Sequence, residues 1–550
     1  MKLFFSDRNR KRLRGWRMVC QFAAVLLTAA LPAFAAGGRA QEEVTRDFAK
    51  TMTLGAGQSV SIEHKFGEVK VHGESGRDVK ISATIRAQAN SHEEAESFAQ
   101  KIQIEVQQTG AGVSIRTIYP LEENKWFHLS KHSSWSVSYD IAIPSDAPLN
   151  IRNSFGGVDI AGVHGAVVVE NGYGSLVVRD AGPANLSNAF GSIELEGASG
   201  RAVVNNKNSS VQVSDVKGPL EVQNRFGSIT AQNVQGAATI TGGNGAVTLA
   251  DAGSANITTS FGSVNAQNIR GDLSIHDNNG NVDFSTIGGS ADIIDSFGNV
   301  TFSGVKGRVS CTSNNGRITA SALTGSSVII RDSFGNLELE NVSASLDAET
   351  SNGKITVRDV RGNVTLKSSF GAIEATNVPK GIRAVTGNGA ITLTDIGADA
   401  YAKTSFGSIL AERINGNLTA EDSNGSVTAR NVKGDASVTT SFSGVTLESI
   451  GGSIRVDNQN GAISVTALRP ASGCRDIALK TSFSSILVRI PDGVGYNVAA
   501  RTSFGRVSSE LPVTATGNLG GNSLNGTIGS GGCQLQLTDS NGSIEIAKAP

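Results

Sequence analysis

A phenylalanine followed by glycine or serine recurs through residues 155–442 at intervals of 35 to 37 residues. Asn-Gly pairs lie halfway between most of these phenylalanines, so the true repeat is 18 residues long, with Phe and Asn alternating at one position. A fixed short period is the signature of a repeat architecture, in which each unit stacks on its neighbours. The repeat-corner phenylalanines are Phe155, Phe190, Phe226, Phe261, Phe297, Phe334, Phe370, Phe406 and Phe442.

Between these corners, apolar and polar side chains alternate. Ile373 and Ala375 lie two positions apart, Val378 follows, and Ile391 repeats the position of Ile373 one unit later. Residues two apart in a strand place their side chains on the same face. Each 18-residue unit therefore reads as two short strands that share one apolar face.

A unit of two strands cannot bury its own apolar face, so consecutive units must stack. Equal units stack so that each strand pairs with the same strand of the next coil. We therefore expect an all-β chain that forms a long single-chain parallel β-solenoid, or β-helix. Residues 151–468 would hold about 18 coils of about 18 residues each.

The flank before the repeat predicts a cap of mixed α and β structure, because an open strand edge at the end of a rod invites aggregation. This flank contains a coil-like stretch at 65–71 and a helix at about 91–104. Ser91 and Glu94 have the spacing of a capping box at the start of that helix. Two further strands are expected at about 112–118 and 135–143.

The flank after the repeat loses the 18-residue rhythm, as expected of an irregular β cap. The predicted domains are a signal peptide at 1–36, an N-terminal β-rich cap with one short helix at 41–145, the solenoid at 146–468 and a C-terminal β cap at 469–550.

The first 36 residues have the pattern of a secretory signal peptide. Residues 1–17 carry seven basic side chains and one acidic one, and an apolar run from Met18 to Ala36 ends in small residues. The alternative is a retained anchor, since this run is just long enough to span a bilayer. No later segment is apolar enough to cross a membrane, and residues 37–550 carry a net charge of about −7. We expect an exported chain that is periplasmic, on the cell surface or secreted.

Three cysteines follow the predicted signal peptide. Export to an oxidising compartment permits a disulfide, although sequence alone does not fix the connectivity. Cys474 and Cys533 are the candidate pair, because both lie in the C-terminal flank. Cys311 occupies an inward strand position, where a buried structural thiol is expected.

Candidate chemistry is sparse. A net charge of −1 for the whole chain is unlike the basic footprint of a nucleic-acid-binding protein. Some β-helices are polysaccharide lyases or hydrolases, which need acidic side chains converging on one face. Here the acidic residues are scattered over different positions of the coil, and His128 and His132 are the nearest approach to a metal spacing. We therefore assign no catalytic, metal or cofactor-binding residue, and we expect the protein not to be an enzyme.

The phenylalanine row has two interpretations. Rings two coils apart could form a row that grips sugars or another partner. Alternatively, each ring packs into the corner over the smaller Asn of the adjacent coils, and the glycine that follows leaves space for it. The second interpretation is the one that the sequence favours.

The serial Ser-Phe-Gly-Ser-Ile and Asn-Gly strands, the Ile143-Pro144 stretch leading to Ser154-Phe155-Gly156, and the closing 541–548 together resemble the bacterial putative-adhesin or toastrack family. These are β-strand-repeat domains of unknown function, and the resemblance covers about 55–548. It implies a structural or adhesin-like cell-envelope protein that binds a surface polymer or an envelope protein. The alternatives are an envelope-stress accessory module and a carbohydrate-active β-helix enzyme. The sequence does not identify the partner or the oligomeric state.

Overall fold

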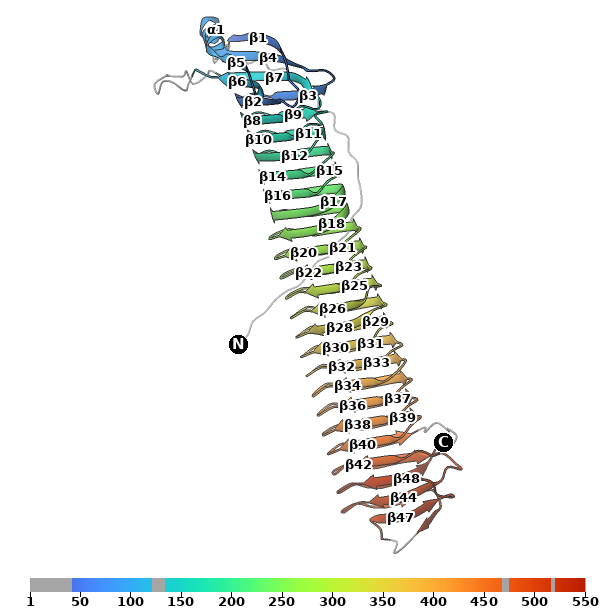
Figure 1. The fold of residues 1–550 in the computed structure, drawn as a ribbon. Helices are drawn as coiled ribbons and strands as arrows, with labels where there is room; N and C mark the ends of the chain where they lie inside the picture. Colours follow the sequence, from blue (N-terminus) through green and yellow to red (C-terminus); the bar gives the residue numbers. More distant parts are fainter. Residues whose placement is uncertain (1–41, 121–133, 467–473, 516–519, 550) are drawn as a thin grey trace, which may run out of the picture.

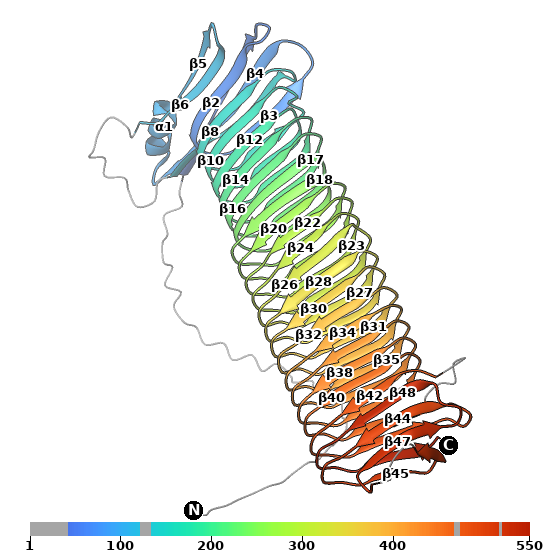
Figure 2. The same ribbon diagram turned by 60° about the horizontal axis from the view of Figure 1, so that its bottom comes forward.

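The computed structural model describes residues 42–120, 134–466, 474–515 and 520–549. The strands stack in sequence along one long rod, with the N-terminal strands at one end and the C-terminal strands at the other (Figure 1). A second view shows the coils joined by narrow corners along the edges of the rod (Figure 2). The predicted signal peptide lies outside the described residues.

The strands of neighbouring coils pair in parallel and in constant register. Ile373 lies opposite Ile355 in the coil before it and opposite Ile391 in the coil after it. These coils each advance the chain by 18 residues, other coils of the repeat advance it by 17 to 19, and the predicted parallel β-solenoid is confirmed. The strands of these coils are β29 (Ile355–Val360), β30 (Val364–Ser368), β31 (Ile373–Val378), β32 (Ile382–Val385) and β33 (Ile391–Ile396). The same arrangement extends from β10 (Val167–Tyr173) to β41 (Ile463–Thr466).

A narrow apolar core runs the length of the rod. In the coil that begins with β33, the inward residues Ile391, Leu393, Ile396, Ala400 and Ala402 are all buried. Full burial of one Ile or Leu side chain stabilises the fold by about 1.5–3 kcal/mol, and every coil repeats this contribution. The apolar face read from the sequence is confirmed.

The N-terminal cap is, apart from its first strand, an insertion between the first two coils. Strands β2 (Ser59–Phe66) and β3 (Val69–Glu74) form the first coil and pair in parallel with β8 (Leu149–Phe155) and β9 (Val158–Ala161). The described residues of 75–148, which are 75–120 and 134–148, lie between them in sequence and cover this coil from the other side. The elements of the cap are β1 (Glu42–Thr53), β4 (Asp78–Ala89), α1 (His92–Lys101), β5 (Gln103–Thr109), β6 (Gly112–Ile118) and β7 (Ser134–Pro144).

The cap closes the rod by changing the direction of pairing. β6 and β7 still lie parallel to β2 and β3, but β4, β1 and β5 pair antiparallel. The helix begins after Ser91, whose hydroxyl accepts the backbone N–H of Glu94 at 3.3 Å. It ends at Lys101 rather than near residue 104, because the chain enters β5 at Gln103.

At the C-terminal end, the order of the coils differs from the order of the chain. β48 (Cys533–Thr538) and β49 (Ile544–Lys548) pair with β42 (Ile477–Lys480) and β43 (Ile486–Ile490), although about fifty residues separate them. The intervening β44 (Tyr496–Arg501) and β45 (Val507–Ser509) lie one coil further out, with β46 (Val513–Ala515) and β47 (Ser523–Ile528) antiparallel at the end. The 18-residue rhythm is lost here because the chain first forms the outer coil of β44 and β45. It then returns to form β48 and β49 between that coil and the coil of β42 and β43.

Candidate functional site: the aromatic column

One corner of every coil carries an aromatic or asparagine side chain, and these corners lie in line along the rod. We call this line the aromatic column. Corner backbone groups of successive coils are hydrogen-bonded to one another throughout. In spatial order the column is Phe66, Phe155, Tyr173, Phe190, Asn208, Phe226, Asn244, Phe261, Asn279, Phe297, Asn315, Phe334, Asn352, Phe370, Asn388, Phe406, Asn424, Phe442, Asn460, Phe483, Asn541 and Phe504.

The nine predicted corner phenylalanines all belong to this column, but their rings are not packed into the corner. Between 41% and 66% of each of these residues is exposed to solvent. The sequence favours rings that pack into the corner over the neighbouring Asn, whereas in the structure about half of each residue lies in solvent. Strand alternation would direct Phe155 inward after Asn153, but the chain turns between Ser154 and Gly156, so the ring points outward.

Tyr173 and Phe483 were missed as members of the column. Tyr173 is followed by glycine and lies 18 residues after Phe155, and Phe483 follows a Thr-Ser pair like that before Phe406. The signal for both is present in the sequence once the period of 18 is applied to every corner.

The glycine that follows most corner residues has a further role. A Cβ atom on Gly335 would collide with the carbonyl oxygen of Gly316 in the coil beneath it. The same collision would occur at Gly353 against Gly335. At these corners the stacked backbones pass too close for a side chain, although Ser209, Ser443 and Ser484 occupy the same position at three other corners.

The residue two positions before every corner except Asn244, where it is Gly242, is a buried polar side chain, and sequence analysis missed this column as well. The hydroxyl of Thr350 accepts the N–H of Gly353 and donates to the carbonyl of Gly335, both at 3.2 Å. Asn458 does the same work with its amide, accepting from the N–H of Gly461 and donating to the carbonyl of Ser443. These side chains satisfy corner backbone groups that the strand ladder leaves unpaired.

Two adjacent members of this polar column are carboxylates. Asp277 and Asp295 are buried on neighbouring coils, and oxygen atoms of both lack a hydrogen-bond partner. Burial, followed by the nearby charge of Asp277, raises the pKa of Asp295 to about 7. Burial also raises the pKa of Asp277. Ionisation of these two buried carboxyl groups is therefore unfavourable in the folded rod.

The corner asparagines lie back along the rod. The Asn460 amide donates to the carbonyl of Ser441 at 2.8 Å, and the Asn424 amide donates to the carbonyl of Ser405 at 2.9 Å. This bond holds the side chain against the preceding coil and leaves open the space between the two neighbouring rings. The same bond is made by Asn208, Asn279, Asn352 and Asn541.

A hollow of about 780 Å³ lies beside the corners of Asn315 and Phe334, over the outward residues of the strands that follow them. It is lined by neutral amides and hydroxyls together with one ring and one arginine. The lining residues are Asn299, Thr301, Asn315, Gly316, Arg317, Thr319, Phe334, Gly335 and Asn336.

Near the N-terminal end every corner carries a ring, and the rings stack. The ring centroids of Phe155 and Tyr173 are 4.9 Å apart with an interplanar angle of 6°, and those of Tyr173 and Phe190 are 4.6 Å apart with an angle of 4°. Phe66 stacks on Phe155 at 5.4 Å. A single coil step therefore brings two corner rings into direct contact.

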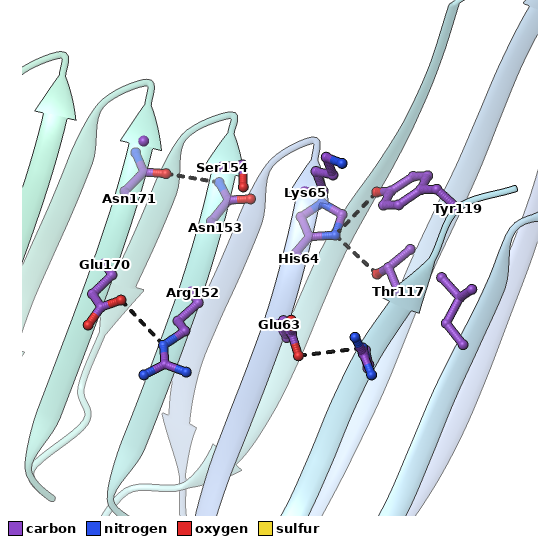
Figure 3. Close-up of a pocket in the computed structure, with 13 residues that line it drawn as sticks. Glu63, His64, Lys65, Thr117, Tyr119, Arg152, Asn153, Ser154, Glu170 and Asn171 are labelled. Atoms are coloured by element: carbon purple, nitrogen blue, oxygen red, sulfur yellow. Dashed lines mark hydrogen bonds and ion pairs between the residues drawn. The ribbon is translucent and has the colours of Figure 1, made fainter. Parts of the chain in front are cut away.

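A second hollow, of about 650 Å³, lies beside the first coils (Figure 3). His64 occupies the buried polar column there, and its Nδ1 is 3.1 Å from the Thr117 hydroxyl, which contacts the Tyr139 hydroxyl at 2.6 Å. Burial lowers the pKa of His64 to about 4, so the imidazole is neutral at neutral pH. Burial raises the pKa of Tyr139 to about 12.

The rim of this second hollow is formed by exposed ion pairs. Glu63 lies 3.5 Å from Arg116, and Arg152 lies 3.3 Å from Glu170, on adjacent strands of the same face. Exposed pairs of this kind contribute little to stability. The neutral imidazole is hydrogen-bonded to neighbouring hydroxyl groups. We interpret this arrangement as a polar contact that joins the cap to the first coils.

The remaining candidate residues are placed as follows. Cys474 and Cys533 form a disulfide that ties the start of the C-terminal flank to β48. Cys311 is buried, and burial raises the pKa of its thiol. His128 and His132 lie outside the described residues. Within the described ranges no three His, Cys, Asp or Glu side chains gather as metal ligands. None of the helices described there is long and apolar enough to cross a membrane.

Comparison with known proteins gives two structural matches. One is a putative cell adhesion protein from Clostridium sporogenes, with 12% identity, covering 40% of this chain and 99% of that one, at a TM-score of 0.19. The other is a putative adhesin from Bacteroides fragilis, with 13% identity, covering 71% of this chain and 98% of that one, at a TM-score of 0.11. No protein-family model and no curated protein matches the chain.

Proposed function

We propose that the protein is an exported, non-enzymatic rod that serves a structural or adhesin-like role in the cell envelope. Its contact surface is the aromatic column, and its partner is a surface polymer or a protein. The basic and apolar pattern of residues 1–36 supports export to the periplasm, the cell surface or the medium.

The observation that carries this proposal is the continuous exposure of the column. Soluble monomeric proteins rarely expose extended apolar surface, and such surface marks interaction sites. Here exposed rings recur at two-coil intervals along the rod, although the same corner accommodates Asn in the alternate coils. Because Asn fills the corner equally well, folding alone does not require the rings.

The test compares binding of the purified protein to isolated bacterial cell envelopes and to a panel of polysaccharides, measured by co-sedimentation. The variant replaces Phe334, Phe370 and Phe406 by Asn, the residue found at the same corner one coil away. The matched control replaces Thr356, Thr392 and Thr428 by Ala on an outward strand position of intervening coils.

We expect the Asn variant to lose at least tenfold in binding and the Thr control to retain it. Equal binding by all three proteins would refute the column as the contact surface. Release of new reducing ends or unsaturated products from any polysaccharide would refute the non-enzymatic part of the proposal.

A further inference from the structure

Phe and Asn continue to alternate along the column at the C-terminal end, where the spatial order of the coils differs from their order in the chain. Between Phe190 and Phe504 the column holds ten Phe and nine Asn in strict alternation. At the C-terminal end, the corner N–H of Asn541 bonds to Ser482 and that of Phe504 bonds to Ser540. The spatial order is therefore Phe483, Asn541, Phe504. Duplication of a 36-residue unit does not explain this order, so the alternation is a property of the surface itself.

The gap between two consecutive rings is the width of one further ring. Corners two coils apart are separated by about 9.6 Å, so a ring midway would lie about 4.8 Å from each neighbour. Stacked aromatic pairs prefer centroid distances of 4.5–7 Å. The rod itself shows this filled arrangement, with Tyr173 lying 4.9 Å from Phe155 and 4.6 Å from Phe190.

From Asn208 onward the gap is open. At six of the nine Asn corners the side-chain amide donates to a backbone carbonyl of the preceding coil, as in Asn541 at 2.8 Å from the Ser482 carbonyl, and this leaves the space between the flanking rings open. We call each such gap, with an Asn as its floor and a Phe on either side, a slot. The column is thus a row of rings and ring-sized slots.

We propose that the aromatic column pairs with the column of a second copy of this chain, in antiparallel orientation, with the rings of each copy filling the slots of the other. The inference rests on the proposed function, since it names the partner of the same contact surface. A second copy has the same spacing of rings along the whole column. An unrelated partner need not have this spacing.

Symmetry selects the antiparallel orientation. A two-fold axis perpendicular to the rod that passes between Phe334 and Asn352 exchanges these two corners, and it sets each Phe from Phe190 to Phe483 of one copy opposite an Asn of the other. At the end of the overlap, Phe504 lies opposite Tyr173. A two-fold axis parallel to the rod would set Phe against Phe at each level. The perpendicular axis gives a closed dimer with one self-complementary surface, the commonest form of soluble oligomer.

The available area fits a stable dimer. Nine rings of each copy, from Phe190 to Phe483, lie within the overlap, and each exposes roughly half of its surface or more. At about 100 Å² per ring, eighteen rings would bury about 1,800 Å², within the range of specific interfaces. Two of the cations flanking the column are neutralised within the rod: Lys354 contacts Glu374 at 2.7 Å, and Arg317 contacts Glu338 at 3.8 Å.

The experiment measures the mass and shape of the exported protein by analytical ultracentrifugation and small-angle scattering. Wild type should be a dimer at micromolar concentration, with the length of one rod and about twice its cross-section. Replacing Phe334, Phe370 and Phe406 by Asn removes rings and should raise the dimer dissociation constant at least tenfold.

A second variant separates slot filling from general stickiness. Replacing Asn352 and Asn388 by Phe closes two slots in each copy by continuing the stack seen at Tyr173, and it adds apolar surface. Pairing by interdigitation predicts weaker dimerisation, whereas non-specific hydrophobic association predicts stronger. Stronger association of this variant would overturn the inference. So would a wild-type protein that is still monomeric at about 100 μM.

Failure of this inference is distinguishable from failure of the proposed function. If wild type is monomeric but the Phe→Asn variant still loses binding to envelopes or to a polysaccharide, the column is a contact surface whose partner is not a second copy. If wild type is dimeric and neither variant changes the dimer, a different surface makes the contact and the pairing proposed here is wrong.

Discussion

Replacing Asp295 by Asn should stabilise the rod at pH 8 and have little effect at pH 4. Asp295 is 2% exposed, its neighbour Asp277 on the adjacent coil is fully buried, and its pKa is raised to about 7 by burial and by the charge of Asp277. Asn is already accepted in this buried polar column at Asn188 and Asn458. The substitution therefore removes a charge without introducing a new shape.

The sign follows from the proton balance. Between about pH 4 and pH 7 the folded protein retains a proton on Asp295 that the unfolded chain has released, so the free energy of unfolding falls as the pH rises. A raised pKa of about 7 against an ordinary value of 3.8 is about three units, and at 1.36 kcal/mol per unit this is at most about 4 kcal/mol. We expect the Asn variant to gain about 2–4 kcal/mol at pH 8.

The assay is hydrogen exchange of the segment around 291–312, read as a function of pH, because a repeat rod opens locally as well as globally. Asp395 is the matched control. Asp395 is exposed, and its carboxylate accepts a hydrogen bond from Arg413 at 2.6 Å, which lowers its pKa. The ionised carboxylate therefore stabilises the folded rod above the ordinary pKa of Asp, and this contribution is lost as the pH falls. Asp395→Asn should therefore slightly weaken the rod at pH 8. A wild-type segment that is better protected at pH 8 than at pH 5, or an Asp295→Asn variant that is less protected at pH 8, would refute the reasoning.

Three further perturbations test the coil geometry and one tests the C-terminal end. Ile391→Asp places a charge in the core and should cost several kcal/mol, whereas Thr392→Asp on the outward side should cost about 0.5 kcal/mol; equal shifts in thermal melts would contradict the inward assignment. Gly353→Ala forces a Cβ against the next corner and should lower the free energy of unfolding by about 2 kcal/mol or more, measured in urea. Deleting 334–369 removes two coils in register and should leave a folded rod about 10 Å shorter by small-angle scattering; an unfolded product would mean that the period is misread. Cys474→Ser opens a loop of 59 residues and should destabilise the C-terminal end by about 3–4 kcal/mol, seen as faster exchange confined to that end.

The solenoid could be predicted because its determinants are local and repeated. Ile373 and Ile391 occupy the same position of successive 18-residue units, and strand alternation alone places both inward. The Ser91 cap likewise needs only its own helix. In such cases a short stretch of chain contains the whole cause of its conformation.

The column of buried polar side chains and the outward rings could not be predicted in the same way. Thr350 is one of many threonines in the chain, and only the approach of the preceding corner gives its hydroxyl two backbone partners. At Phe155 alternation indicates the wrong side, because the direction of the ring depends on how the corner turns over the coil beneath it.

The sequence by itself therefore determined the period, the strand pattern and the core of this rod, since each depends on residues close together in the chain. Only the tertiary structure decided which side the corner rings face, that the cap is inserted after the first coil, and that Asn541 lies between Phe483 and Phe504. The physical reason is the same in each case. These features are set by hydrogen bonds and close contacts between stacked coils, whose partners can lie 18, 59 or more residues apart in the chain.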